Sequence, residues 1–226
     1  MSVAARMLQT SRMPVLIVPG AAVRQYARPA VGAVASRGID ARLLPAPGEP
    51  GAPADLQNYG EELARRISTG SPLDLLVGLS VGAQAAAVAA TAVPTGQVRH
   101  VMLISPTVDP NVRTAPRLLG RWLAGGRLER PGLLSEQAPD WRRAGLRRLV
   151  RVVRSALAVR IEDLLPRLGA ALTVGHAEHD VITSHSYAAR LAADHRGRFI
   201  VVPGATHSWP YADADRFADT VEDVLG

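Results

Sequence analysis

The chain has 226 residues, of which 47% are hydrophobic and 20% charged, a composition that is typical of a globular protein and excludes a disordered one. It contains no cysteine, which excludes disulfides, thiolate metal sites and cysteine nucleophiles. The formal net charge of +6 is concentrated, because residues 113–160 hold twelve arginines and three acids, whereas the remainder holds fourteen arginines and seventeen acids. A charge excess confined to one segment argues against a nucleic-acid-binding protein.

Nothing in the sequence indicates a membrane protein. Residues 1–13 lack the apolar core of a signal peptide. The longest apolar run, around residues 83–90, is too short to span a bilayer. We therefore expect a soluble, cytoplasmic protein with one domain and an insertion.

Short apolar runs alternate with segments of helical periodicity along most of the chain. Strands are expected, in chain order, over residues 14–18, 39–44, 73–77, 98–104, 171–174 and 198–202. Helices are expected between or after them, over residues 23–37, 55–67, 83–90, 184–193 and 212–225. This alternation predicts an α/β fold with a parallel sheet covered by helices on both faces.

The alternation breaks between residues 107 and 168. This segment contains Gly125-Gly126 and several prolines, and its only periodicity is helical. We expect a helical insertion here, with a core formed by residues 1–106 and 169–226. Its arginines have two interpretations: they form the solvated face of an amphipathic helix, or a basic rim that attracts an anionic substrate.

The motif Gly78-Leu79-Ser80-Val81-Gly82 lies between an expected strand and an expected helix. In that context G-x-S-x-G predicts a nucleophile elbow, a sharp turn that exposes the serine hydroxyl. Glycines suit such a turn because the serine backbone is strained and neighbouring side chains would collide. The alternative is an ordinary glycine-rich turn between strand and helix.

A serine nucleophile needs a base within hydrogen-bond reach and an acid that orients the base. The loop after the strand at 171–174 carries Asp180, and the loop after the strand at 198–202 carries His207. Both follow the carboxyl end of a parallel strand, where such sheets place their sites. The order serine, acid, histidine is the one expected for a hydrolase on this kind of sheet.

Other residues near these loops have competing interpretations. His176 and His179 stand beside Glu178 and Asp180, but four ligands within five consecutive residues cannot all converge on one ion, so we expect neither a metal nor another cofactor. Trp209 and Tyr211 follow the histidine and line either the mouth of a pocket or the core.

These motifs resemble those of the α/β-hydrolase superfamily over nearly the whole chain. The matching stretches are residues 16–20, 78–82, 175–180 and 202–207. The resemblance implies Ser80 as nucleophile, His207 as base and Asp180 as acid. Asp109 is an alternative acid, because it lies near the end of the strand at 98–104, from which some members of the superfamily take their acid; otherwise Asp109, before Pro110, is a turn residue.

The resemblance also implies an oxyanion hole formed by the backbone N–H groups of Ala21 and Val81, and a cap at residues 107–168. Three features depart from the family pattern. Pro19-Gly20 replaces a His-Gly pair, and residues 45–48 replace an Asp-rich turn and have no assigned role. The chain begins at the family's third strand, so we expect a sheet of about six strands.

The resulting hypothesis is a serine hydrolase that cleaves an ester or thioester through an acyl-enzyme at Ser80. Its expected substrate is a small acyl compound: a carboxylate-bearing ester, an acyl-coenzyme A or the phosphopantetheine arm of an acidic carrier protein. One alternative is a non-hydrolytic lyase, cyclase or acyl transferase on the same fold. Another is a binding module with a relic site.

Overall fold

A computed structural model describes residues 14–226, and the expectation for residues 1–13 lies outside this range. Six parallel strands form one sheet in the order β2-β1-β3-β4-β5-β6. They are β1 (Val15–Val18), β2 (Ala41–Leu43), β3 (Leu73–Leu79), β4 (Val98–Ile104), β5 (Ala171–Ala177) and β6 (Arg198–Val202). The strand order reverses between β1 and β3, which is where open parallel sheets bind ligands.

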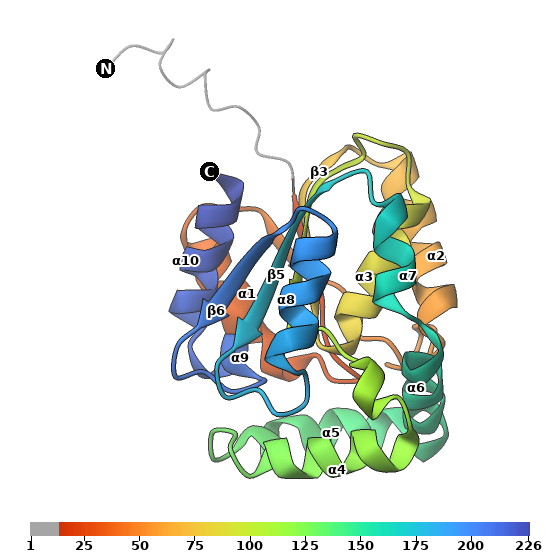
Figure 1. Cartoon of the computed structure of the whole chain (residues 1–226), viewed down its shortest axis with the longest axis vertical. Coiled ribbons are helices and arrows are strands. Elements are labelled where there is room, and N and C mark those ends of the chain that lie inside the picture. Colours follow the sequence, from red (N-terminus) through yellow and green to blue (C-terminus); the bar gives the residue numbers. More distant parts are fainter. Residues whose placement is uncertain (1–13) are drawn as a thin grey trace.

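Helices cover both faces of the sheet, as predicted (Figure 1). One hydrophobic core lies under α1 (Arg28–Ser36) and α10 (Ala214–Leu225). The other lies under α2 (Leu56–Thr69), α3 (Val81–Ala92) and α8 (His185–Asp194). The inner strands are buried on both sides, which explains why β3 and β4 are nearly continuous apolar runs.

Helix α3 lies deepest because its side chains are small. It is alanine-rich and buried from residue 82 to residue 90. A Cβ on Gly60 of α2 would lie 2.5 Å from Val88 of α3, so the glycine permits these helices to approach closely. Asp55 begins α2 by accepting a hydrogen bond from the N–H of Asn58 at 3.0 Å.

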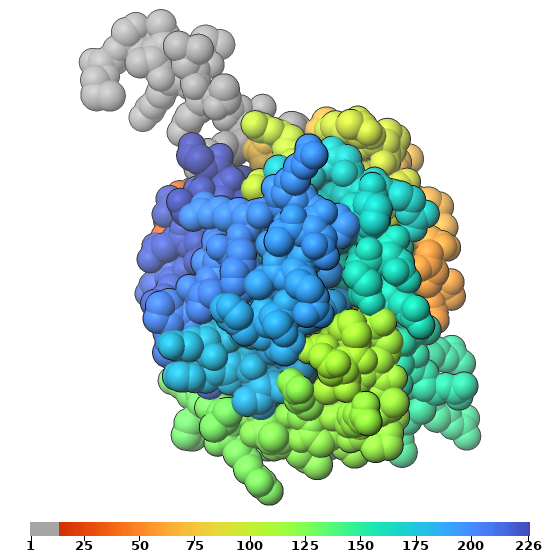
Figure 2. Space-filling model, in the orientation of Figure 1, coloured from red at the N-terminus to blue at the C-terminus, as the bar shows by residue number. Residues whose placement is uncertain are grey.

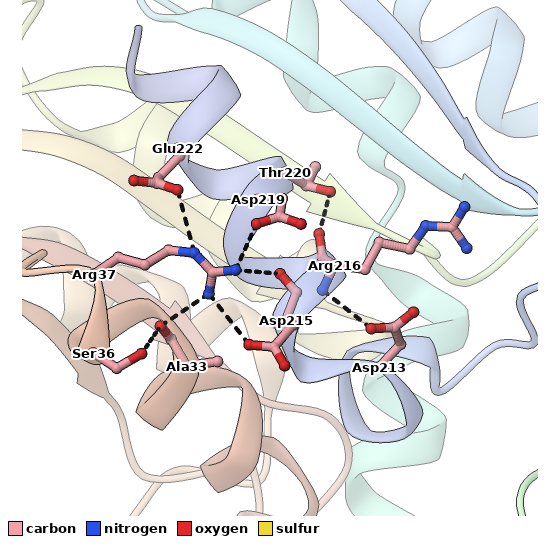
Figure 3. A network of polar contacts seen from close by, with 9 residues as sticks. All are labelled: Ala33, Ser36, Arg37, Asp213, Asp215, Arg216, Asp219, Thr220 and Glu222. Carbon is pink, nitrogen blue, oxygen red and sulfur yellow. Dashed lines mark hydrogen bonds and ion pairs between the residues drawn. The ribbon is translucent and has the colours of Figure 1, made fainter.

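On the opposite face, Arg37 connects α1 to α10 (Figure 3). Its guanidinium lies 3.6 Å from the carboxylate of Asp215 and 3.2 Å from that of Glu222, and it also pairs with Asp219. It donates a further hydrogen bond to the Ala33 carbonyl at 3.2 Å. One cation thus balances three acids of α10 and fixes the two helices together.

The segment between β4 and β5 is helical. It contains η3 (Pro110–Val112), α4 (Ala115–Gly126), α5 (Leu133–Ala144), α6 (Leu146–Ala158), α7 (Ile161–Leu164) and η4 (Leu165–Arg167). Helices α4 and α5 lie across the end of the molecule at which the strands finish (Figure 1), and Figure 2 shows a continuous surface there. Within residues 14–226, no helix is long and apolar enough to cross a membrane.

Two short elements complete the fold: η2 (Gln25–Ala27), after β1, and α9 (Trp209–Ala212), between β6 and α10. Each lies beside a loop that leaves the sheet at its carboxyl edge. The loops after β1, β3, β5 and β6 all leave the sheet at this edge because the strands are parallel. The predicted site residues are therefore all carried to one end of the sheet.

Candidate active site

The turn between β3 and α3 forces Ser80 into an unusual backbone conformation. Its φ of 56° and ψ of −121° are rare for a residue with a side chain. A Cβ on Gly78 would lie 2.5 Å from the Cα of Ala83, and one on Gly82 would lie 2.4 Å from the Val18 carbonyl oxygen. Both glycines are required because strand, turn and helix approach too closely for a side chain at either position.

A continuous chain of hydrogen bonds joins Ser80, His207 and Asp180. The Nε2 atom of His207 lies 2.9 Å from the Ser80 Oγ, and its Nδ1 atom lies 2.9 Å from the Asp180 Oδ2. The second oxygen of Asp180 accepts hydrogen bonds from the N–H groups of Ile182 at 2.8 Å and Thr183 at 3.0 Å. The carboxylate is thereby held with both oxygens satisfied.

Burial and charge act in opposite directions on this pair. Burial alone would raise the pKa of Asp180, but the charge and hydrogen bond of His207 hold that pKa below its ordinary value. Burial alone would lower the pKa of His207, but the charges of Asp180 and Glu129 raise it above its ordinary value. The carboxylate of Asp180 and the imidazole of His207 therefore stabilise each other's charged forms.

Asp109, the alternative acid, has other partners. One of its carboxylate oxygens accepts a hydrogen bond from the N–H of Asn111 at 2.8 Å, at the start of η3. The other accepts a hydrogen bond from the Ser184 hydroxyl. The structure thus joins Asp180, and not Asp109, to His207.

The two backbone groups expected to form an oxyanion hole lie on adjacent elements. Ala21 follows β1 and Val81 is the first residue of α3, and Gly82 allows the end of β1 and the start of α3 to approach closely. In the part of the chain that the structure describes, neither N–H donates to another protein group, whereas the neighbouring Ala22 N–H donates to the Pro47 carbonyl at 2.8 Å. The turn at residues 45–48 therefore anchors the loop after β1.

Comparison with known proteins agrees with this architecture. The model of the alpha/beta hydrolase family matches residues 15–220. The chain belongs to this family. No curated protein is similar enough in sequence to match the chain.

Solved structures of this family's fold superpose over nearly the whole chain. The enol-lactonase from Burkholderia xenovorans LB400 has a TM-score of 0.71 and 15% identity, covering 96% of this chain and 93% of its own. A hydrolase from Oleispira antarctica has a TM-score of 0.78 and 12% identity, covering 96% and 92%. The bromoperoxidase from Bacillus anthracis has a TM-score of 0.75 and 14% identity, covering 95% and 92%. At these identities the likeness establishes the α/β-hydrolase fold.

Three residues that touch the site were missed by the sequence prediction. The Tyr26 hydroxyl accepts a hydrogen bond from the Gly20 N–H at 3.1 Å, beside Ser80. Trp141 of α5 donates from Nε1 to the Ala21 carbonyl at 3.1 Å. Glu129 contacts the loop that carries His207. No spacing or motif marks these positions, and Trp141 and Glu129 act on loops that are remote in sequence.

Of the two aromatic residues after the histidine, Trp209 is a core residue. Its side chain is buried and packs against Phe217 with the ring centroids 5.7 Å apart. This position favours the core interpretation of Trp209 over the pocket one. Tyr211 is partly exposed, and the guanidinium of Arg130 lies 5.8 Å from its ring centroid.

The histidines near Asp180 also have structural surroundings. His176 is buried against the rings of His185 and Phe199, and burial lowers its pKa. Glu178 accepts a hydrogen bond from the Gly204 N–H at 2.7 Å. Among residues 14–226, no group of three or more histidine, aspartate or glutamate side chains is arranged to hold a metal.

Proposed function

We propose that this α/β-hydrolase family member is a serine hydrolase that cleaves a carboxylic ester or thioester through an acyl-enzyme at Ser80. The observation that supports it is the hydrogen-bonded chain from the Ser80 Oγ through His207 to Asp180, with both links at 2.9 Å. A nucleophile, a base and an orienting acid in this geometry are the parts that acyl transfer requires.

In the acylation step, the Ser80 Oγ attacks the acyl carbon while its proton passes to Nε2 of His207. Asp180 accepts a hydrogen bond from Nδ1–H, which fixes the imidazole and stabilises its protonated form. The carbonyl oxygen becomes an oxyanion, which the N–H groups of Val81 and Ala21 stabilise. The start of α3 adds its positive helix end at Val81.

Acylation ends when the first tetrahedral intermediate collapses: the bond to the leaving group breaks, His207 gives its proton to the departing alcohol or thiol, and the acyl-enzyme remains on Ser80. A water then replaces the leaving group, and His207 takes its proton as it adds to the acyl carbon. Collapse of the tetrahedral intermediate releases the carboxylic acid and restores the Ser80 hydroxyl. Every proton in this cycle passes through one imidazole.

The helical segment at residues 107–168 is proposed to act as a cap. It contacts three loops of the site: Arg121 donates to the Val181 carbonyl at 3.0 Å, Glu129 contacts the His207 loop, and Trp141 donates to the Ala21 carbonyl. Its arginines, many of them exposed, give it a strongly basic surface. Such a surface favours an anionic acyl substrate, free or carried on coenzyme A or an acidic carrier protein.

A fluorophosphonate probe tests the proposed nucleophile. Wild-type protein is expected to be labelled, and Ser80→Ala is expected to abolish labelling without unfolding the protein. A correctly folded wild type that is not labelled would contradict the proposal. A panel of p-nitrophenyl esters, acyl-coenzyme A thioesters and amides then identifies the bond; turnover retained by Ser80→Ala but lost in His207→Ala would indicate a non-hydrolytic reaction instead.

A further inference from the structure

Glu129 reaches from the helical segment to the loop that carries the proposed base. It lies in the turn between α4 and α5, far in sequence from His207. Its Oε2 accepts a hydrogen bond from the Thr206 hydroxyl at 3.0 Å, and its Oε1 accepts one from the Ser208 N–H at 3.2 Å. Since Thr206 and Ser208 are the two neighbours of His207, one carboxylate holds the chain on both sides of the imidazole.

The charge of Glu129 also acts on His207. The titratable groups that face His207 are Asp180, Glu129 and His176, and of these the two carboxylates raise the pKa of His207. Burial raises the pKa of Glu129 itself, against the opposing effects of His207 and of the hydrogen bonds from Thr206 and Ser208. Glu129 is thus a second carboxylate beside the imidazole, and its hydrogen bonds come from the Thr206 hydroxyl and the Ser208 N–H, not from the ring.

We propose that Glu129 is a positioning residue that holds the His207 loop from the cap and stabilises the imidazolium formed when Ser80 loses its proton. This inference rests on the proposed serine mechanism. Because Glu129 belongs to the segment between β4 and β5, alignment of the base depends on docking of that segment against the core. The neighbouring Arg130, over the ring of Tyr211, provides a second contact at the same place.

The rate of fluorophosphonate labelling as a function of pH separates charge from hydrogen bonding. Glu129→Gln keeps the shape of the side chain and removes its charge. The ascending limb of its profile is expected about half to one pH unit below that of wild type, with a plateau about three- to tenfold slower. Thr206→Val removes one hydrogen bond to Glu129 and keeps the charge of Glu129. Its labelling plateau is therefore expected to fall, while the ascending limb of its pH profile stays in place.

The matched control is Glu136→Gln, which removes an exposed carboxylate from α5 of the same segment. Its profile is expected to coincide with that of wild type. The inference is overturned if Glu129→Gln also coincides with wild type, or if Glu136→Gln shifts by the same amount. Thermal unfolding of each variant shows that the comparison is made on folded protein.

Titration of the His207 ring by NMR, assigned with His207→Gln, gives a readout that needs no reaction. A lower His207 pKa in Glu129→Gln than in wild type and Glu136→Gln supports the charge effect, and an unchanged value refutes it. If His207 of the wild-type protein titrates but the fluorophosphonate never labels Ser80, the serine mechanism itself is refuted. Labelling of wild type together with an unshifted Glu129→Gln refutes only the role of Glu129.

Discussion

Substitution of Gly82 by alanine tests how tightly the nucleophile turn is built. The added Cβ would lie 2.4 Å from the Val18 carbonyl oxygen and 2.5 Å from that of Pro19. A carbon–oxygen contact is ordinarily about 3.3 Å or longer, so a gap of about 0.9 Å has to open. Both oxygens belong to the backbone and cannot rotate away. The end of β1 and the loop carrying Ala21 therefore have to move relative to α3.

Two effects follow from that displacement. Overpacking of this kind costs about 1–3 kcal/mol in free energy of unfolding. In a chain of this size, each kcal/mol lowers the melting temperature by about 2–4 °C, so a fall of about 2–12 °C is expected. The N–H of Ala21 also moves by about 1 Å from its proposed place in the oxyanion hole, which reduces the acylation rate about 100-fold.

The assay combines thermal unfolding with the rate of fluorophosphonate labelling. Gly32→Ala is the matched control, because Gly32 lies in α1 and a Cβ there meets no atom within 4 Å. This control is expected to label at the wild-type rate and to be stabilised by about 0.5–1 kcal/mol. If Gly82→Ala unfolds and labels like Gly32→Ala, the close approach of β1 to the nucleophile turn does not matter and the reasoning fails.

Three further predictions concern the acid, the base and the scaffold. Asp180→Asn is expected to slow labelling about 10³–10⁴-fold. Asp109→Asn is expected to lower the free energy of unfolding by about 1–2 kcal/mol and to change the labelling rate less than tenfold. Equal losses of labelling rate in the two variants would contradict the assignment of Asp180 as the acid. The pKa of His207 is raised above 6.5, and the neutral ring is the base. The labelling rate measured across pH is therefore expected to fall as the pH drops through a midpoint above 6.5. A midpoint below 6.5 would contradict this. Arg37→Ala is expected to lower the free energy of unfolding by about 1 kcal/mol at low salt and by less in 1 M salt, with unchanged labelling; no salt dependence would refute the ion-pair account of this residue.

The sheet and the nucleophile turn could be predicted because their signals are local. Apolar runs marked all six strands, and G-x-S-x-G between a strand and a helix marked the turn at Ser80. The ends of the strands were predicted less accurately. The strand expected at 171–174 extends to Ala177 because Gly175 and Ala177 pair with β6, a contact that the sequence pattern does not contain.

The support of the site could not be predicted, because it comes from distant parts of the chain. Glu129 is an isolated acid in an arginine-rich segment, and it acts on a loop nearly eighty residues later. Trp141 contacts Ala21 across 120 positions. Pro47 anchors the loop after β1 from a turn that had no assigned role. Such contacts depend on how the insertion docks on the sheet, which periodicity within one element does not encode.

Detection of the acyl-enzyme tests the central proposal most directly. Wild-type protein is mixed with a p-nitrophenyl ester, quenched in acid within milliseconds to seconds, and measured by intact mass and peptide mapping. The proposal predicts a burst of p-nitrophenol and an acyl adduct on the peptide containing Ser80, with neither in Ser80→Ala. Turnover of the ester by Ser80→Ala at the wild-type rate, with no adduct on wild type at any quench time, would contradict it.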